Sequence, residues 1–266
     1  DAFSLFGMQI NANSLNIILP VGISFYTFQT LSYTIDVYKK KLEPTKDFIA
    51  FSAFVCFFPQ LVAGPIERAT NLLPQIREKR IFKKSFFKEG IIQICVGLFR
   101  KVVVADTLAN YVDIVYGDIN LYDSSTIFLA TFFYTFQIYF DFSGYSDMAI
   151  GLAKIFGITL PVNFNSPYKS YSIIEFWKKW HITLSNFFKL YVYFPIGGNK
   201  TGVMKQLLNI FFVMFLAGFW HGASWNFIIW GGVHGVFIIT NHIWRIITRD
   251  WYMNKKFKSI NLLLTF

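Results

Sequence analysis

One histidine stands in the middle of a long stretch that contains no charged residue. His221 lies between Gln206 and Trp244, and no Asp, Glu, Lys or Arg occurs between them. This stretch is long enough for about two membrane crossings, since one crossing needs roughly 20 apolar residues. An ionisable side chain at membrane depth is costly and often marks a functional pathway. Imidazole exchanges protons near neutral pH, so we predict catalysis or proton transport at His221. An interhelical hydrogen bond explains a single membrane histidine equally well.

The other three histidines carry weaker signals. His181 follows two lysines in the segment 176–185, where an interfacial amphipathic helix with an incidental histidine is the simpler interpretation from these residues alone. His234 and His242 are two helical turns apart and share a face, which interhelical hydrogen bonds would explain. The histidines show neither H-x-x-x-H nor H-E-x-x-H spacing, so we predict no metal site.

Two aspartates within an apolar stretch are further candidates for a site. A carboxylate at the centre of a membrane helix costs about 2.5–3.5 kcal/mol, so Asp141 and Asp147 need a cationic partner or a water-filled cavity. Arg100 and Arg68 are the candidate partners, and a structural ion pair and a catalytic role both remain open. The tryptophans near the histidines are candidates for pocket walls that exclude water: Trp177, Trp220 and Trp225.

The composition indicates a membrane protein. Of the 266 residues, 54% are hydrophobic and 15% are charged, whereas soluble domains carry about 25% charged residues. Aromatic residues reach 20%, as expected for a chain with tyrosine and tryptophan at the membrane interfaces. The apolar runs are continuous rather than alternating, which favours helices over a β-barrel. We therefore predict an all-α, polytopic integral membrane protein that forms a single domain over residues 1–266.

The charge pattern supports the same prediction. The net charge is +10, but the basic residues lie between apolar runs, as the positive-inside rule predicts, and do not indicate nucleic-acid binding. We assign the basic loops 77–88 and 245–258 to the cytoplasmic side. Cys56 and Cys95 are predicted to be buried, unpaired thiols. No Walker A, G-x-G-x-x-G or G-x-S-x-G motif occurs, so nothing supports ATP hydrolysis or serine-hydrolase chemistry.

The apolar segments give the expected helices, and the segment 163–167 between two of them is turn-like. Pro20 and Gly22 predict a kink near the start of the first segment. The chain opens without a signal peptide and ends in what looks like the start of another apolar segment, so we expect it to be a piece of a longer protein. The expected segments are 17–35, 48–62, 90–109, 125–158, 172–196 (a helix followed by a less regular stretch) and 206–244.

Several ordered motifs together resemble a known family. Among them are Phe-Trp-Lys-Lys-Trp-His at 176–181 and Gly-Phe-Trp-His-Gly at 218–222. With these motifs the chain resembles the membrane-bound O-acyltransferases, in the bacterial branch that includes alginate O-acetyltransferase. The stretches that carry the resemblance are 19–29, 32–38, 58–68, 141–151, 176–185, 193–199 and 218–222.

This resemblance implies a multi-helix membrane bundle with a central funnel, placed in the inner or plasma membrane. It also implies that the N-terminal part and the last helices of the usual family span are missing. The residue at the position of His221 is regarded as catalytic in the family, and the one at His181 as the second functional histidine. The family often carries Arg-Asp before the tyrosine at position 191, where this chain has Lys189 and Leu190. Because this chain lacks the aspartate of that pair, any role of its carboxylate is in doubt here.

The resulting hypothesis is O-acyl transfer, with acetyl as the group that the resemblance implies. His221 would act as general base on an acceptor hydroxyl, and His181 would position a substrate or donate to the developing oxyanion. Acetyl-CoA is the expected donor substrate, and no bound cofactor is expected. The implied acceptor is a polysaccharide or an extracytoplasmic partner protein that completes the transfer. The alternatives are D-alanyl transfer, a transporter with a His/Asp proton relay, and a silent assembly subunit.

Overall fold

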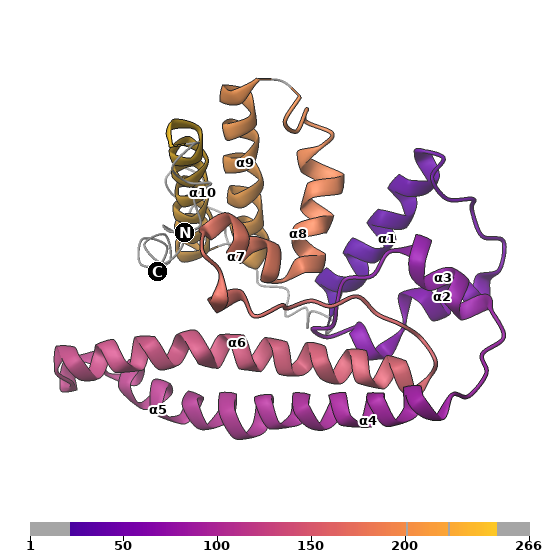
Figure 1. Ribbon diagram of the computed structural model, residues 1–266, viewed down its shortest axis with the longest axis horizontal. Coiled ribbons are helices and arrows are strands. Elements are labelled where there is room, and N and C mark those ends of the chain that lie inside the picture. Colours follow the sequence, from indigo (N-terminus) through magenta and orange to yellow (C-terminus); the bar gives the residue numbers. More distant parts are fainter. Residues whose placement is uncertain (1–21, 201, 223, 249–266) are drawn as a thin grey trace, which may run out of the picture.

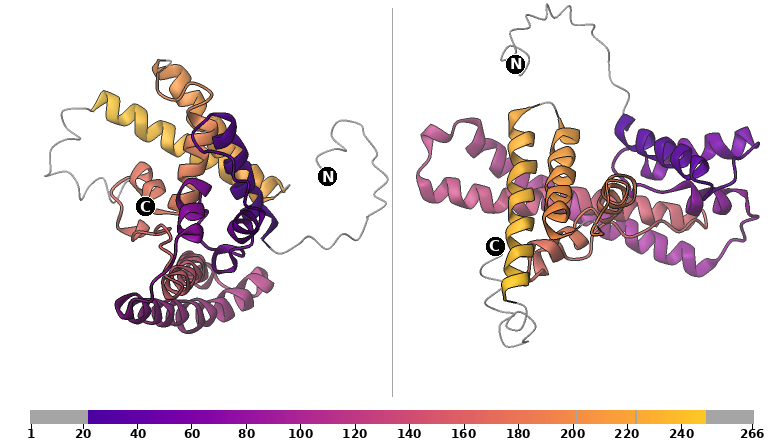
Figure 2. Two further views of the ribbon diagram at one scale, coloured as in Figure 1. Left: turned by 90° about the vertical axis from the view of Figure 1, so that its right-hand side faces the viewer. Right: turned by 90° about the horizontal axis from the view of Figure 1, so that it is seen from above.

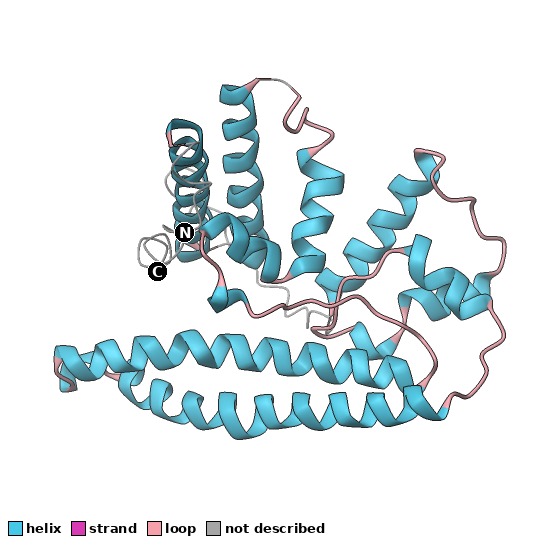
Figure 3. Ribbon diagram, viewed as in Figure 1, coloured by secondary structure: helices cyan, strands magenta, loops and turns pink. Residues whose placement is uncertain are grey.

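A computed structural model describes residues 22–200, 202–222 and 224–248. Within these ranges every regular element is helical and no strand occurs (Figure 3). The helices are α1 (Ile23–Tyr38), α2 (Phe48–Val55), α3 (Ala69–Arg77), α4 (Lys84–Leu98), α5 (Asp106–Gly117), α6 (Ser124–Ile155), α7 (Ile173–Lys179), α8 (Ile182–Phe188), α9 (Val203–His221) and α10 (Trp225–Ile247). Two π-helical segments, Phe99–Ala105 and Lys189–Tyr193, extend α4 and α8.

The long helix α6 forms one layer with α4 and α5 (Figure 1). Two pairs of glycines bring α4 and α6 into close contact. A Cβ atom on Gly97 would lie 2.6 Å from the carbonyl oxygen of Gly144, and one on Gly90 would lie 2.6 Å from that of Gly151. The glycines are seven residues apart in both helices, so they recur on one face, and small residues at such positions allow helix backbones to approach closely.

Helices α9 and α10 form an antiparallel hairpin on one side of the α4–α6 layer (Figures 1 and 2). Both are long and apolar enough to cross a membrane, as predicted for the uncharged stretch. The outward side of α9 is apolar, with large exposed side chains at Leu208, Phe212, Phe215 and Phe219. From Leu208 onward this outward face carries no charge, while the exposed Lys205 lies in the first turn. An apolar outward face matches a helix that contacts lipid.

The contact between α9 and α10 leads to a prediction about two adjacent glycines. A Cβ atom on Gly231 would lie 2.6 Å from the carbonyl oxygen of Met214, whereas one on Gly232 would meet nothing within 4 Å. We expect Gly231→Ala to destabilise the protein by about 1–3 kcal/mol through overpacking. Gly232→Ala should stabilise it by up to about 1 kcal/mol, because alanine is the better helix former. Thermal unfolding of the two full-length variants would measure both shifts, and shifts of the same sign would contradict this account.

Helix α1 buries its polar face and exposes apolar side chains. Gln29, Ser32 and Asp36 follow one another at helical spacing, and each is only 1% exposed. On its other faces Leu31 is 44% exposed and Tyr38 is 86% exposed. This polarity is the reverse of that of a surface helix in a soluble protein and fits a helix whose surroundings are apolar.

The segment 156–172 runs back along α6 before it reaches α7 (Figure 1). Its side chains contact α6 in reverse order: Asn163 reaches Ser146 by a hydrogen bond of 3.3 Å. Further along, the ring of Phe164 lies 5.0 Å from that of Phe142, and the Tyr168 hydroxyl donates to the carbonyl of Thr135. The polar and aromatic side chains of this segment therefore fix its path and deliver the chain to the start of α7.

The structure corrects several expectations about the helices. The stretch 48–62 is not one helix, because α2 ends at Val55 and a short 3-10 helix, Phe58–Gln60, follows; Pro59 has no N–H to continue the ladder. The expected short helix 90–109 is part of a continuous run from α4 through the π-helix into α5. The stretch 172–196 contains two helices, α7 and α8, with a break between them.

Other expectations concern the chain's ends and its thiols. Helix α1 begins directly after Gly22, which has a φ of 79°; Pro20, most of the basic loop 245–258 and the terminal apolar segment lie outside the described residues. Cys56 and Cys95 are free, but both are exposed. The prediction that they are buried is wrong, because apolar stretches in this chain turn much of their surface outward.

Candidate active site

His181 occupies the sharp break between α7 and α8. Its backbone is left-handed, with φ 42° and ψ 55°, which is uncommon for a residue other than glycine. A capping contact starts α7, since the Ser172 hydroxyl accepts from the backbone N–H of Glu175. Lys179 then ends the helix and pairs with Glu175 at 2.8 Å. The α7 cap and the break at Trp180 together set the position of the His181 ring.

Asn163 holds this break together from the preceding segment. Its backbone carbonyl accepts from the N–H of Ile182 at 2.9 Å. Its side-chain oxygen contacts Nδ1 of His181 at 3.1 Å and accepts from Thr183 twice, from the hydroxyl at 2.9 Å and from the N–H at 3.3 Å. Asn163 is fully buried. The strained backbone at His181 is therefore supported by several hydrogen bonds to one residue.

The His181 ring is enclosed by aromatic side chains. It is 3% exposed, with the edge of Phe142 at 4.7 Å and the ring of Phe164 stacked at 6.4 Å between centroids. Burial, with a smaller contribution from the charge of His221, lowers the pKa of His181 to about 3. His181 is therefore neutral at physiological pH.

His221 is the last residue of α9 and lies among aromatic rings. Its ring centroid is 4.8 Å from Trp220, 5.9 Å from Phe227 and 5.2 Å from Trp230. His221 is exposed, whereas His181 is buried. Of the predicted pocket residues, Trp220 touches His221 directly, whereas Trp225 starts α10 and is 51% exposed.

An aromatic contact chain connects α7 to the end of α9. Trp177 packs on Trp230 at 5.7 Å and on His234 at 5.2 Å. Trp230 in turn contacts His221. Side chains of α10 thus join α7, which precedes His181, to the end of α9 that carries His221. Trp177 also lines a cavity between these helices.

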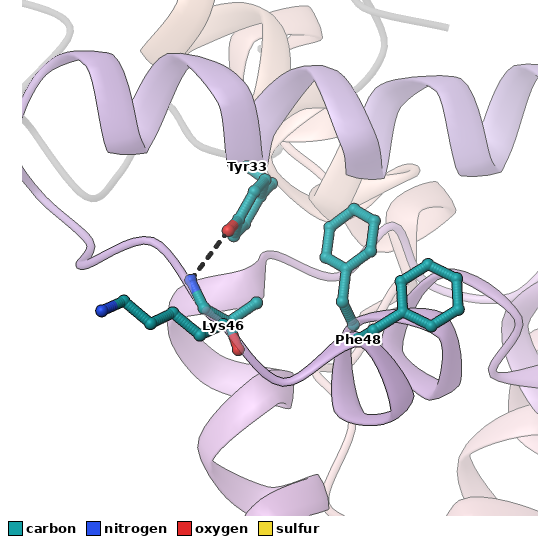
Figure 4. A pocket seen from close by; sticks show the side chains of 5 residues that line it. Tyr33, Lys46 and Phe48 are labelled. Atoms are coloured by element: carbon teal, nitrogen blue, oxygen red, sulfur yellow. Dashed lines mark hydrogen bonds between the residues drawn. The ribbon is translucent and has the colours of Figure 1, made fainter.

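A cavity of about 550 Å³ opens between α7, α8, α9 and α10. It reaches Ile182, which follows His181, and Ala217, one turn before His221, although neither histidine lines it. Its lining is largely apolar with basic side chains at Lys178, Lys189 and Arg245. A smaller pocket of about 300 Å³ lies between α1 and α2, lined by Tyr33, Lys46 and Phe48 among others, where the Tyr33 hydroxyl accepts from the N–H of Thr45 (Figure 4). That pocket includes none of the predicted site residues.

The two aspartates of α6 form ion pairs with the π-helical segment 99–105. Asp147 pairs with Arg100 and also accepts from Gln93, and Asp141 pairs with Lys101 at 2.6 Å. The expected partner Arg100 is therefore confirmed for Asp147, while Arg68 pairs elsewhere. These contacts join α6 to its neighbour and explain how the carboxylates are tolerated in an apolar stretch. Among the described residues, no group of three or more His, Cys, Asp or Glu side chains could hold a metal ion.

A second buried polar cluster joins three distant parts of the chain. Arg68 contacts Asp36 at 2.5 Å, and the Tyr191 hydroxyl donates to the same carboxylate oxygen at 2.7 Å. The Arg68 Nε–H also donates to the Tyr191 oxygen at 2.9 Å. A carboxylate thus does lie beside the tyrosine at position 191, but α1 supplies it rather than the residues just before the tyrosine.

A buried glutamate in the loop before α3 leads to a prediction about pH. Glu67 is 4% exposed, and burial raises its pKa from 4.5 to about 7. The folded state therefore favours the protonated carboxyl. The contribution of Glu67 to stability is complete below about pH 4.5 and is lost as the pH rises to about 7. The loss is about 3 kcal/mol.

We expect Glu67→Gln to remove this pH dependence. The apparent melting temperature of the full-length protein should fall between about pH 5 and pH 8 more steeply in wild type than in the variant. Glu78→Gln, at an exposed position, serves as the matched control and should follow wild type. Parallel curves for wild type and Glu67→Gln would contradict the prediction.

The residues that support His181 were not predicted from the sequence. Asn163 was read only as part of a turn-like segment, and Thr183 and Ser146 were read only as parts of motifs. The available signal was a polar residue, Asn163, directly before an aromatic residue in a turn-like segment. Its hydrogen-bond partners, Ser146 and Thr183, lie 17 and 20 positions away in the chain. Only the folded chain shows that they meet.

Comparison with known proteins decides the family. A model of the membrane-bound O-acyltransferase family matches residues 43–264, which include both candidate histidines. The chain belongs to the membrane-bound O-acyltransferase family. The family is membrane-integral, and α9 and α10 fit that setting.

Three similar proteins are named for the transfer of acetyl or D-alanyl groups, in connection with peptidoglycan, alginate and teichoic acid. A peptidoglycan O-acetyltransferase of Helicobacter pylori is 38% identical over 95% of this chain and 53% of its own length. A probable alginate O-acetylase AlgI of Pseudomonas aeruginosa is 45% identical over 90% of this chain and 45% of its own length. A teichoic acid D-alanyltransferase of Bacillus subtilis is 29% identical over 91% of this chain and 62% of its own length. The chain spans about half the length of the first two relatives.

Proposed function

We propose that the protein transfers an acyl group, acetyl in the first instance, from a thioester to hydroxyls of a cell-surface or secreted polysaccharide. The observation that carries this proposal is that the family-matched region holds both candidate histidines, with the end of α9 joined to α7 through the ring contacts Trp177–Trp230–His221. His181 is buried and neutral, while His221 is exposed at the end of a membrane helix. Two imidazoles in different environments suit different roles in one reaction.

In the proposed step, His221 acts as general base. It takes the proton of the acceptor hydroxyl as the hydroxyl oxygen attacks the acyl carbonyl carbon. The tetrahedral intermediate then collapses, the carbon–sulfur bond breaks, and the thiolate leaves with the electron pair. The proton on His221 returns to that thiolate, so the ring ends neutral. Trp220 and Trp230 would keep water from the reacting atoms on either side of the imidazole.

The donor in this proposal is acetyl-CoA, bound in the 550 Å³ cavity. The apolar lining would hold the pantetheine part, and Lys178, Lys189 and Arg245 would attract the phosphates. The acyl end would leave the cavity near Ala217, one turn before His221. The basic loop 77–88 adds a second cationic surface, with a cavity of about 230 Å³ lined by Lys79, Arg80 and Lys83. We place these basic groups on the cytoplasmic side, where the positive-inside rule puts them.

The proposed setting is the inner or plasma membrane, which the whole protein would cross several times around a central funnel. The acyl group would then leave on the opposite side and reach the polymer directly or through an extracytoplasmic partner protein. An acetyl group delivered outside from a cytoplasmic thioester requires a path through the membrane, and residues around His221 would line that path.

The test is an assay of the full-length protein in membrane vesicles with acetyl-CoA labelled in the acetyl group. We expect labelled acetyl in an ester on polysaccharide, together with free CoA. Labelled D-alanine supplied on its thioester carrier would test the D-alanyl alternative. Uptake of solute or protons without ester formation would instead support the transporter alternative. No ester from either donor would overturn the proposal.

The polymer is identified by comparing cells with and without the protein. Mass spectrometry of secreted glycans, peptidoglycan and teichoic acid should show acetyl esters that are lost from one of the three. Unchanged acetylation of all three polymers would contradict the assigned substrate class and would favour a silent assembly role.

A further inference from the structure

The hydrogen-bond chain around His181 has a direction that backbone donors impose. The backbone N–H of Ile66 donates to the Thr183 hydroxyl oxygen at 3.0 Å. Because that oxygen already accepts, its own hydrogen is free to point at the Asn163 side chain, 2.9 Å away. A backbone N–H is always a donor, so the polarity of this first link does not depend on any choice of protonation.

The same polarity determines which end of the Asn163 amide faces His181. The N–H and the hydroxyl of Thr183 both donate to one atom of Asn163, which must therefore be the carbonyl oxygen. The amide nitrogen points the other way, to the Ser146 hydroxyl at 3.3 Å. The nearest ring atom of His181, Nδ1, lies 3.1 Å from that carbonyl oxygen. Two acceptors cannot share a hydrogen bond, so Nδ1 must carry the proton.

We infer that Asn163 and Thr183 hold His181 as the Nδ1–H tautomer, so that Nε2 presents a lone pair and accepts a hydrogen bond from a substrate hydroxyl. A neutral imidazole has one donor nitrogen and one acceptor nitrogen, and the partner of one nitrogen sets the state of the other. Asn163 is thus a positioning residue for His181. The consequence for catalysis rests on the proposed acyl transfer, whereas the tautomer itself does not.

Two observations at Nε2 agree with this assignment. Nε2 is buried and has no hydrogen-bond partner among the described residues, although buried polar atoms are nearly always paired. The low pKa of the ring keeps it neutral, so a second proton does not convert Nε2 into a donor. A hydroxyl from a bound acceptor would satisfy the lone pair at a site otherwise walled by Phe142 and Phe164.

This inference separates two roles that the sequence left open for His181. An oxyanion is stabilised by hydrogen-bond donors, and Nε2 without a proton cannot donate. His181 therefore orients the acceptor through a hydroxyl other than the attacking one, because the single proton of the attacking hydroxyl goes to His221. It does not stabilise the developing negative charge on the acyl oxygen. Removal of the hydroxyl proton falls to His221, and the oxyanion must find its donors elsewhere.

The experiment is nitrogen NMR of the full-length protein labelled with ¹⁵N-histidine in a lipid nanodisc at neutral pH. The His181 signals are identified by their loss in His181→Gln. We expect a protonated Nδ1 and an unprotonated Nε2. A proton on Nε2, alone or together with one on Nδ1, would overturn the inference whatever the activity of the protein.

Variants of the supporting residues test the role of Asn163 separately. Asn163→Leu should release His181 into a mixture of tautomers and lower acyl transfer on the order of 10- to 100-fold, the loss typical of a residue that orients a functional histidine. Thr183→Ser keeps the hydroxyl and should keep the wild-type tautomer. If Asn163→Leu leaves the tautomer unchanged, or if Thr183→Ser shifts it, Asn163 is not the positioning residue.

The experiment distinguishes three outcomes: a variant that does not fold, a protein that does not transfer acyl groups, and a wrong assignment of the His181 tautomer. The wild-type spectrum reports the tautomer even if Asn163→Leu does not fold. A wild-type protein with Nδ1–H at His181 but with no transfer from any thioester would overturn the proposed function and leave the tautomer assignment in place.

Discussion

Replacing His221 with alanine in the full-length protein should lower acyl transfer by about 10²–10⁴-fold, the range that general-base help contributes. The reason is that no other imidazole occupies the end of α9, and His181 is buried and held by Asn163. The measurement is the rate of labelled acetyl transfer from acetyl-CoA to polysaccharide in membrane vesicles, with expression checked by quantifying the protein.

The matched control lies on the same helix. Leu208→Ala removes an exposed apolar side chain of α9 and should transfer acetyl groups at close to the wild-type rate. Unchanged transfer in His221→Ala would exclude this histidine as the base. Equal losses in both variants would mean that the effect comes from perturbing α9 and not from loss of the imidazole.

Replacing Arg68 with alanine should destabilise the full-length protein by about 3–5 kcal/mol, because it leaves a buried charge without its partner. Asp36 is 1% exposed, and among the described residues one of its carboxylate oxygens already has no hydrogen-bond partner. The variant would keep only the Tyr191 hydroxyl at the other oxygen. Thermal unfolding of the purified protein in detergent measures the change.

Two further variants separate the charge from the contacts. Tyr191→Phe removes two hydrogen bonds, one to Asp36 and one from Arg68, and should cost about 1–3 kcal/mol. Combining Asp36→Asn with Arg68→Met removes both charges and should recover most of the stability lost in Arg68→Ala, since replacing a whole buried ion pair is often close to neutral. A double variant as unstable as Arg68→Ala would contradict the buried-charge explanation.

Arg68 also shows where reasoning from sequence reached its limit. An arginine was expected to neutralise the aspartates of α6, and the order of residues offered both Arg100 and Arg68 for that role. Arg100 is carried to Asp147 by the continuous helix from α4 into the π-helical segment. Arg68 instead meets an aspartate that is 32 positions away in α1. Charge pairing depends on which helices lie side by side, and that is not written in local sequence.

The sequence by itself determined the helical class and the two helices of the uncharged stretch that are long and apolar enough to cross a membrane, and its motifs led us to propose His221 and His181 as site residues. These follow from hydropathy and from motifs, which are local properties of the chain. The tertiary structure alone decided how the site is built: the break at His181, the support from Asn163 and Thr183, and the approach of α9 to α7. Hydrogen bonds between residues distant in the chain act only at contact distance, so their partners are set by packing and not by residue type.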